Sequence, residues 1–517
     1  MVRRRGTLAA AIIGSSAVFL DATIVTVALR SIASDLPSRT IGAFEGQAYV
    51  YNGYLLSLSA VLIIAGALAD AYGRRRMFAL GFAAFGVASG LCAVAPSIET
   101  LVLFRVLQGL GGAFLVPGSL AILAAEFEGA DLGWALGAWA GASAVTTILG
   151  PFVGGVLVET VSWRGAFLVN VPIVAAGLWA TSRWVRESRA HDASRDFDWG
   201  GAVLGALAIG GLSFGMIDGQ QRAWADPLAP AALLLGGAAL AWFLVHLARG
   251  THPLVPLGFF RVRDFAVTNA STFLIYGVLY VVIYLVPTFV QGTLGYSAAA
   301  AGLVTLPTGL LLALLSPAAG RAGARRGPRM FMTVGPLLIA AGLLWLALLP
   351  GDPVAWKLDP GNAATFIPPA SAMVAFLPWA LLQGVGLAVV VAPLTTALMT
   401  SLPRRNAGLA SAINNAISRV GPQLLGAVVF VMVTAVFYAS IARDVPGTDV
   451  GAAAFRTAVG PFNPPAPSVG PDVAAAARSA SIACFRIAMA LAAVIMIGGG
   501  ALNYAGIRPG PREPGAG

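Results

Sequence analysis

Charged side chains are scarce in this chain. Asp, Glu, Lys and Arg make up 10% of its 517 residues, whereas soluble globular proteins carry about 25%. Hydrophobic residues make up 58%, and the mean hydropathy is +0.83. Apolar runs of about 20 residues follow one another along the chain. The composition therefore excludes an ordinary soluble protein and predicts an all-α protein embedded in a lipid bilayer.

Cysteine and histidine are also scarce, with two Cys and three His in the chain. Cys92 and Cys484 fall in separate apolar runs, so we expect no disulfide framework. His191, His246 and His252 lack the spacing of metal ligands, and neither a nucleotide-binding loop nor a nucleophile arrangement is present. We therefore expect no metal, no cofactor and no enzymatic activity.

The net charge of +10 could suggest a nucleic-acid partner. The arginines, however, lie in short loops between apolar runs. Most of them fall on one side of the membrane if the N-terminus is cytoplasmic, as the positive-inside rule requires. We expect a monomeric multi-pass protein of the cell (inner or plasma) membrane, with both termini in the cytoplasm and no nucleic acid bound. The start, MVRRRG, resembles a signal peptide, but we interpret it as part of an uncleaved first span.

The apolar runs predict about fourteen transmembrane helices. The Pro- and Gly-rich segment 441–480 is expected to be an external loop. The predicted spans are 8–30, 47–69, 77–96, 100–125, 133–158, 164–185, 199–217, 228–249, 265–290, 297–320, 329–349, 372–400, 406–439 and 481–505.

The chain also repeats itself. Four positions of the first part recur in the second: Gly66 as Gly320, Gly73 as Gly327, Gln108 as Gln383 and Gly150 as Gly421. Two related six-helix halves with a substrate site between them form a known transporter architecture. We predict an N-terminal half over 1–190, two linker helices within 191–255 and a C-terminal half over 256–517.

Asp21 is the only acidic residue deep inside a predicted span. It lies about 20 Å along a helix from Leu8, past the middle of the bilayer. Burial favours the protonated form of a carboxyl group, so Asp21 is a candidate for binding a coupling proton. The alternative is that it only caps or pairs with a neighbouring helix. Arg105 also lies within a span and needs a partner, for which Asp21 is available; alternatively it extends to the outer face or binds backbone carbonyls.

Polar side chains within other spans are expected to line a central cavity, since such groups avoid lipid. The predicted cavity residues are Asn52, Tyr54, Gln108, Thr272, Tyr276, Tyr280, Gln383, Asn415, Arg419 and Gln423. Ser411 extends the stripe of Asn415 and Arg419, and Tyr284 extends that of Tyr280, unless Tyr284 belongs to an interfacial belt. One aspartate facing two arginines disfavours dicationic substrates and favours neutral, zwitterionic or anionic hydrophobic ones.

Several segments resemble signatures of the major facilitator superfamily. Gly66 to Arg76 (GALADAYGRRR) looks like its loop signature, Arg105 to Ala113 like its fourth-helix signature, and Gly150 to Gly155 like its fifth-helix antiporter signature. With Leu20 to Leu29 (LDATIVTVAL) and Trp163 to Ile173 (WRGAFLVNVPI), the set resembles the fourteen-span drug:proton antiporter branch.

The resemblance implies the major facilitator fold, with two six-helix halves plus two extra central helices. It also implies export driven by inward proton flow, with Asp21 as the protonation site and Arg105 as its helper. Two departures are Thr146, where the antiporter signature usually has glycine, and Ala324, where the repeated loop motif loses its aspartate.

The same motifs supply the predicted gating residues. These are Gly66, Asp70, Gly73, Arg74, Arg75, Gly150, Pro151, Gly154 and Gly155. Gly73 permits a tight turn, Asp70 can accept hydrogen bonds from a helix N-terminus, and Pro151 permits a bend. The alternatives are simple positive-inside anchoring for the loop and plain helix packing for the glycines.

These observations predict a secondary transporter that exports small amphipathic compounds in exchange for protons as its two halves rock. One alternative is a dedicated exporter of an endogenous metabolite, pigment or lipid. An alternative of a different class is a non-transporting membrane receptor or an enzyme built on the same scaffold.

Overall fold

The computed structural model describes most of the chain. The described residues are 2–38, 42–127, 129–188, 198–221, 224, 226–250, 253, 257–349, 353–359, 362–402 and 407–508. Some side chains within these ranges are not described, among them those of Asp70, Ala324, Ser411, Asn415, Arg419 and Gln423. The predicted boundary between the N-terminal half and the linker, at 190–191, also lies outside the described residues.

The described residues form helices and no strand. The helices before the linker are α1 (Val2–Asp35), α2 (Ala43–Tyr72), α3 (Arg74–Ala93), α4 (Ile98–Gly112), α5 (Leu115–Glu126), α6 (Gly129–Thr160), α7 (Gly165–Leu168) and α8 (Asn170–Trp184). The linker contributes α9 (Trp199–Gln221) and α10 (Leu228–Arg249). The remaining helices are η1 (Leu257–Arg261), α11 (Arg263–Gly292), α12 (Ala298–Arg326), α13 (Pro328–Ala347), η2 (Ala363–Phe366), α14 (Ala370–Ser401), α15 (Ala407–Asp444), α16 (Ala453–Ala458) and α17 (Pro471–Gly506).

Twelve helical segments of the described residues are long and apolar enough to cross a membrane. The helices α2 and α6, of 30 and 32 residues, run beside them. The all-α membrane fold is therefore as predicted, while the count of fourteen spans stays a prediction.

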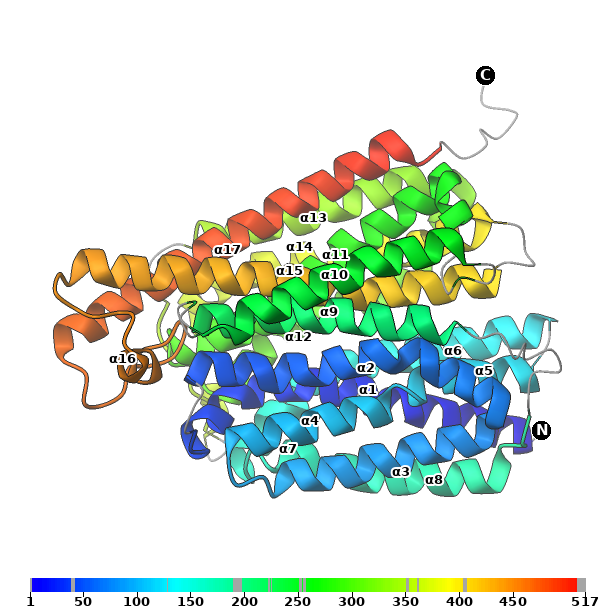
Figure 1. The fold of residues 1–517 in the computed structure, drawn as a ribbon, viewed down its shortest axis with the longest axis horizontal. Coiled ribbons are helices and arrows are strands. Elements are labelled where there is room, and N and C mark those ends of the chain that lie inside the picture. The colour runs from blue at the N-terminus through cyan, green and yellow to red at the C-terminus, as the bar shows by residue number, and fades with distance from the viewer. Residues whose placement is uncertain are drawn as a thin grey trace.

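The helices form two groups that lie side by side (Figure 1). Helices α1 to α8 make the N-terminal half, and α11 to α17 make the C-terminal half. The linker helices α9 and α10 pair with each other, and α9 packs against both α2 and α15. The linker therefore covers one side of the seam between the halves. On another side of the molecule, α6 of one half packs along α12 of the other.

Two predicted spans are broken where proline follows. The span 100–125 divides into α4 and α5 at Ala113 and Phe114, three to four residues before Pro117. The span 164–185 divides at Val169, three residues before Pro172. Proline lacks an amide hydrogen and its ring clashes with the preceding turn of a helix. Other prolines, among them Pro151, Pro287 and Pro422, lie within continuous helices, so proline alone does not predict these breaks.

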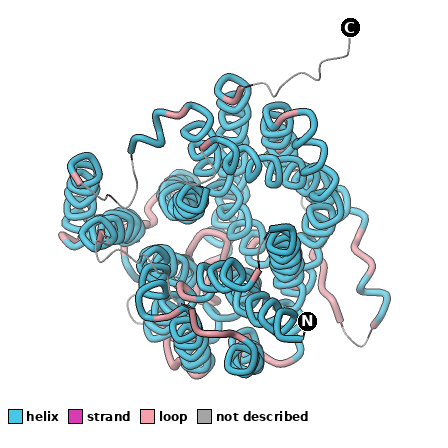
Figure 2. The backbone as a smooth tube through the Cα atoms, turned by 90° about the vertical axis from the view of Figure 1, so that its right-hand side faces the viewer, coloured by secondary structure: helices cyan, strands magenta, loops and turns pink. Residues whose placement is uncertain are grey.

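The bundle has two distinct ends. The first turn of α1 and the last turn of α17 lie at what we call the terminus end, and α16 lies at the opposite, loop end (Figure 1). Figure 2, viewed from the terminus end, shows most helices end-on. Within the predicted external segment 441–480, α15 continues to Asp444, α16 spans Ala453–Ala458 and α17 begins at Pro471, while the external placement stays a prediction. The start of α17 is rich in alanine, a strong helix former.

Candidate functional site

Asp21 lies on α1 inside the N-terminal half, and its side chain is fully buried. Nη1 of Arg105 on α4 donates a hydrogen bond to Oδ2 of Asp21, forming an ion pair. The amides of Gln108 on α4 and Asn170 on α8 donate to the other oxygen, Oδ1, at 2.8 and 2.9 Å. A buried charge is stable only when it is paired and hydrogen-bonded. The carboxylate of Asp21 meets that condition through donors from two other helices.

Arg105 is held from several sides and is fully buried, so it does not extend to the helix end. Its Nε donates to the carbonyl oxygen of Val50 on α2 at 3.1 Å, and Nη1 also donates to Oε1 of Gln108 at 2.6 Å. The ring of Tyr54 lies 4.1 Å from the guanidinium carbon, a favourable cation–π distance. The hydroxyl of Tyr54 donates to the carbonyl of Val18 on α1. The ion pair thereby joins α1, α2 and α4.

Asn170 and Ser89 complete this network, and the sequence analysis missed both. The side-chain amides of Asn170 and Gln108 donate to Oγ of Ser89 at 3.0 and 3.1 Å, and Ser89 donates to the carbonyl of Phe167. Asn170 belongs to the WRGAFLVNVPI segment. An amide side chain in an otherwise apolar run was the available signal, because such a group needs a partner in the membrane.

A cavity of about 120 Å³ lies between the two halves, where α1 and α6 face α11, α12 and α14. Its polar lining consists of hydroxyls and one amide: Thr23, Thr26, Thr147, Thr305, Thr308 and Gln383. Nε1 of Trp379, another lining residue, donates to Oε1 of Gln383 at 2.7 Å. None of the described residues that line this seam cavity is charged.

The seam cavity and the ion pair share helix α1 but lie on different sides of it. Thr23 and Thr26 face the cavity, whereas Asp21 faces the interior of the N-terminal half. Of the predicted cavity residues, Gln383 lines the seam cavity. Tyr54 and Gln108 instead surround the ion pair, because Arg105 needs their ring and carbonyl oxygen.

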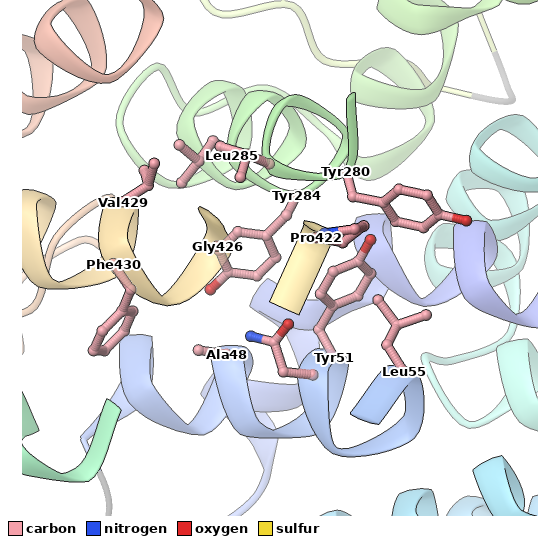
Figure 3. Close-up of a pocket in the computed structure, with 12 residues that line it drawn as sticks. Ala48, Tyr51, Leu55, Tyr280, Tyr284, Leu285, Pro422, Gly426, Val429 and Phe430 are labelled. Atoms are coloured by element: carbon pink, nitrogen blue, oxygen red, sulfur yellow. The ribbon is translucent and has the colours of Figure 1, made fainter. Parts of the chain in front are cut away.

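A narrower slot of about 30 Å³ lies between α2, α11 and α15 (Figure 3). Tyr51 and Asn52 line it from α2, and Tyr280 and Tyr284 line it from α11. The rings of Tyr51 and Tyr284 stack with their centroids 5.3 Å apart. This volume suits one or two water molecules rather than a drug-sized molecule. Asn52 and Tyr280 therefore lie in a tightly packed part of the seam.

The remaining predicted cavity residues fall into two groups. Thr272 is fully buried and accepts a hydrogen bond from Asn414 of α15 at 2.7 Å, so it ties two helices of the C-terminal half together. Tyr276 is half-buried and packs against the apolar core. The polar stripe on α15 lies outside the described side chains: Ser411, Asn415, Arg419 and Gln423.

The GALADAYGRRR segment makes the turn between α2 and α3. Gly73 has φ +114°, a conformation that other residues rarely adopt. The backbone amides of Arg75 and Arg76 donate to the carboxylate of Glu187 at 3.1 and 3.2 Å. A carboxylate at a helix N-terminus is favourable, so Glu187, which was not predicted, caps α3. At the repeated position, Gly327 has φ +84° and likewise precedes a helix.

Three other predicted gating residues, Gly66, Asp70 and Arg74, belong to the same segment. A side chain at Gly66 would meet open space, so close packing does not require glycine there. The side chain of Asp70 lies outside the described part of the chain. Arg74 has its Nη1 3.4 Å from the carbonyl of Ala121 on α5, a long hydrogen bond within the same half.

The fifth-helix signature contributes Gly150, Pro151, Gly154 and Gly155 to α6. Two of its glycines lie against α1, where a Cβ would collide with α1 side chains. Gly155 faces the other half, and a Cβ there would lie 2.5 Å from Cα of Ala299 on α12. From α12, a Cβ at Gly302 would lie equally close to the carbonyl of Pro151. These small residues let the two halves pack backbone to backbone.

Polar contacts join the halves at the loop end. Arg30 of α1 donates to the carbonyl of Gln291, near the C-terminus of α11. A carboxylate oxygen of Glu159 on α6 accepts from the amide of Ala299, at the N-terminus of α12, at 2.7 Å. A cation at a helix C-terminus and an anion at a helix N-terminus are both stabilising. Charged residues of one half thus complement helix ends of the other.

The ion pairs of the described residues at the terminus end behave differently. Each joins elements of the N-terminal half or of the linker: Arg3–Glu126, Arg4–Asp131, Arg76–Glu187 and His246–Asp198. In this structure the halves are therefore fastened together at the loop end.

No group of three His, Cys, Asp or Glu among the described residues could hold a metal ion. The family model of the Major Facilitator Superfamily matches residues 11–425. The chain belongs to the Major Facilitator Superfamily. Membership identifies it as a multi-pass membrane transporter, and the two packed helix groups are the halves of this fold.

Named relatives and a solved structure agree with the family. The chain is 32% identical over 426 residues to the tetracenomycin C resistance and export protein of Streptomyces glaucescens, covering 82% of this chain and 75% of that one. It is 33% identical over 445 residues to the multidrug resistance protein Stp of Mycobacterium tuberculosis, covering 85% and 78%. A bacterial homolog of the human lysosomal transporter Spinster has the same fold, with a TM-score of 0.64 at 17% identity over 98% of this chain and 97% of the other.

Proposed function

We propose that this transporter exports small amphipathic compounds in exchange for protons and belongs to the fourteen-span drug:proton antiporter branch. The fully buried Asp21–Arg105 pair carries the proposal, because an intramembrane ion pair that costs so much to bury is retained for a function. The names of its relatives, which are resistance and export proteins, support the direction of transport. We place the protein in the cell membrane as a monomer with both termini in the cytoplasm.

The proposed cycle is alternating access by rocking of an N-terminal half, 1–190, against a C-terminal half, 256–517, with the linker 191–255 over the seam. In this orientation the loop end is external, and the contacts of Arg30 and Glu159 with the other half close the external side. The glycine contacts between α6 and α12 form a closely packed interface that can open and close again. The captured state then corresponds to one open toward the cytoplasm.

The proton step is proposed to act through α1. Protonation of Asp21 cancels its charge and weakens the bond from Arg105, while the hydrogen bonds from Gln108 and Asn170 remain possible. Since Thr23 and Thr26 lie on the cavity side of the same helix, a small shift of α1 alters the seam cavity. Asp21 thus influences the substrate without touching it.

The substrate class follows from the lining of the seam cavity. Hydroxyls, one amide and the Trp379 ring suit an uncharged or weakly polar amphipathic molecule. None of the described lining residues is acidic, so a dication would find no counter-charge there. Neutral, zwitterionic or anionic hydrophobic compounds are the proposed substrates.

A dedicated exporter of an endogenous product is a second candidate, supported by the tetracenomycin export protein among the relatives. Both candidates predict gradient-driven movement of an amphipathic compound and differ only in the breadth of substrates accepted.

Reconstitution into proteoliposomes with an imposed pH gradient tests the proposal. We expect accumulation of a neutral or anionic hydrophobic antibiotic that collapses when a protonophore is added. A receptor or an enzyme on this scaffold would move neither protons nor compound. Preferential transport of a dicationic biocide would contradict the proposed substrate class.

A further inference from the structure

A second buried carboxylate, Glu45, lies in the first turn of α2 at the loop end. Its side chain is 1% exposed. Neither of its carboxylate oxygens has a hydrogen-bond partner among the described residues. Asp21, by contrast, accepts bonds from three donors. An ionised carboxylate without partners is very costly to bury, so burial raises the pKa of the Glu45 carboxyl to about 7 and favours its protonated form.

The described titratable groups that face Glu45 come from the C-terminal half. Tyr284 of α11, Tyr438 of α15 and Arg456 of α16 are the titratable groups that interact with it electrostatically. Arg456 is the one cation among these described groups. Its Nε donates to the carbonyl of Val450 at 3.0 Å, and its guanidinium stacks on the Tyr438 ring at 4.3 Å.

Burial of Glu45 therefore depends on contact between the two halves. Two residues further along α2, the Gln47 amide donates to Oδ1 of Asn463 at 2.8 Å. One turn beyond, Tyr51 stacks on Tyr284 beside the slot shown in Figure 3. All these contacts cross the seam, so separating the loop ends would uncover the carboxyl group. Once solvated, it lies at the third residue of a helix, where the dipole favours the ionised form.

We propose that Glu45 is a second proton-binding residue of the transport cycle, protonated while the loop-end seam is closed and ionised while it is open. This inference rests on the proposed function, because it requires the halves to rock. In the proposed orientation, the proton of Glu45 comes from the external solution and returns to it. Glu45 thus links external pH to opening, whereas Asp21 carries the coupling proton.

The sign of the effect follows from this environment. The closed seam binds one more proton than the open seam, so acid stabilises closure. The stabilisation is fully present at low pH and is lost as the pH rises and the closed state itself ionises. For one linked proton, the ratio of open to closed molecules rises by up to about tenfold per pH unit.

Asp35 supplies a matched control at the same end. Its carboxylate accepts hydrogen bonds from Trp163 and Arg164 at 2.8 and 2.6 Å, both within the N-terminal half. Opening of the seam leaves those partners in place. Asp35→Asn therefore removes an acidic group of the loop end without removing a group that the other half covers.

Double electron–electron resonance on the full-length protein in nanodiscs measures the distance between the two halves at the loop end. Spin labels replace the exposed residues Val161 and Lys357, one from each half. The two native cysteines, Cys92 and Cys484, are changed to alanine. Distances are recorded without substrate from about pH 5 to about pH 9, a range that spans carboxyl groups with and without burial.

We expect the labelled parent to open as the pH rises and Glu45→Gln to remain closed across the range. Glu45→Asp, which keeps a titratable group, should retain a pH-dependent seam, and Asp35→Asn should behave as the parent. If Glu45→Gln does not fold, the comparison of Glu45→Asp with the parent still tests the proposal. Running Asp21→Asn in parallel separates the contribution of the central ion pair.

A Glu45→Gln variant with the parent's pH dependence would overturn the proposal, and so would a parent whose seam does not respond to pH. Failure of the proposed function has a different signature. In that case no compound moves in proteoliposomes, while the pH response of the seam and its loss in Glu45→Gln persist.

Discussion

The two halves of this transporter share a fold, but among the described side chains only the N-terminal half contains a fully buried ion pair. In the N-terminal half, Arg105 pairs with Asp21 and the pair is surrounded by amides and a hydroxyl. The offset of 275 residues between the Gln-Gly motifs places Ala380 at the position of Arg105. The offset of 254 residues between the loop motifs places Leu343 at the position of Ser89. Both replacements are fully buried and apolar.

The C-terminal half ties its helices together with neutral groups. Nδ2 of Asn503 on α17 donates to Oγ of Ser271 on α11 at 2.8 Å and to the carbonyl of Met332 on α13 at 2.7 Å. Asn414 of α15 donates to Oδ1 of Asn269 on α11 at 3.1 Å. Among the described side chains, these contacts between helices of the C-terminal half are hydrogen bonds between neutral groups. This difference supports the proposal that the charges of the N-terminal half serve transport.

Neutralising the aspartate should have the largest effect on transport. In Asp21→Asn the amide keeps the size of the side chain and can still accept from Gln108 and Asn170, so we expect normal insertion. Proton-driven export should be abolished because no group remains to exchange the proton. Export in proteoliposomes under a pH gradient measures this, with Asp35→Asn as the control. Gradient-dependent export by Asp21→Asn would show that the charge difference between the halves is not the basis of coupling.

Removing one partner of the pair should damage stability more than removing both. Arg105→Met leaves the Asp21 charge buried and unpaired, which costs about 3–5 kcal/mol. The double variant Asp21→Leu/Arg105→Met imitates the apolar C-terminal half and should recover most of that loss while remaining inactive. Thermal unfolding in detergent is compared for the parent, the single variant at each of the two positions and the double variant. Equal destabilisation in the single and double variants would mean that the pair contributes nothing by pairing.

The sequence predicted the centre of this site better than its surroundings. A charge within an apolar run has a strong energetic requirement, so Asp21 and Arg105 could be paired from the chain alone. Asn170 and Ser89 are neutral, so their requirement for a partner is weaker: the amide of Asn170 in an apolar run was a signal, whereas single hydroxyls such as that of Ser89 are common in spans. Glu45 was missed for another reason. It lies at the edge of a span, where acidic residues are ordinary, and its burial comes from helices far along the chain.

The fold was also predictable in part: the positions of the long helices were predictable, but their ends were less so. Apolar run lengths located the long helices, since each must satisfy its own backbone in lipid. Helix ends were less predictable: α1 extends through its three N-terminal arginines, and α17 begins ten residues before its predicted span. Run length measures the width of the hydrocarbon layer, whereas a helix continues into water wherever helix formers follow.

The seam glycines allow a smaller perturbation of the contact between the halves. Gly155→Ala would place a methyl carbon 2.5 Å from Cα of Ala299, so the backbones of α6 and α12 must separate. We expect a destabilisation of about 1–3 kcal/mol for the closed loop end and a shift toward the open seam in spin-label distances. Gly90→Ala is the control, because its added carbon meets nothing within 4 Å. If the two variants behave alike, close approach at α6 and α12 does not hold the halves together.

The smallest effect is expected from replacing the glycine in each of the two repeated turns. Gly73→Ala and Gly327→Ala each force a non-glycine residue to a positive φ, at a cost of about 1 kcal/mol. The first should be the more harmful, because its added carbon would also lie 2.6 Å from a carboxylate oxygen of Glu187, which caps α3. At the second turn, Gly327 provides no side-chain cap to α13, and Pro328 at the first position lacks an amide hydrogen. Apparent melting temperatures of the two variants measure the difference. Equal losses would indicate that Glu187 moves aside freely, and that the turn of the N-terminal half is no more specialised than its repeat.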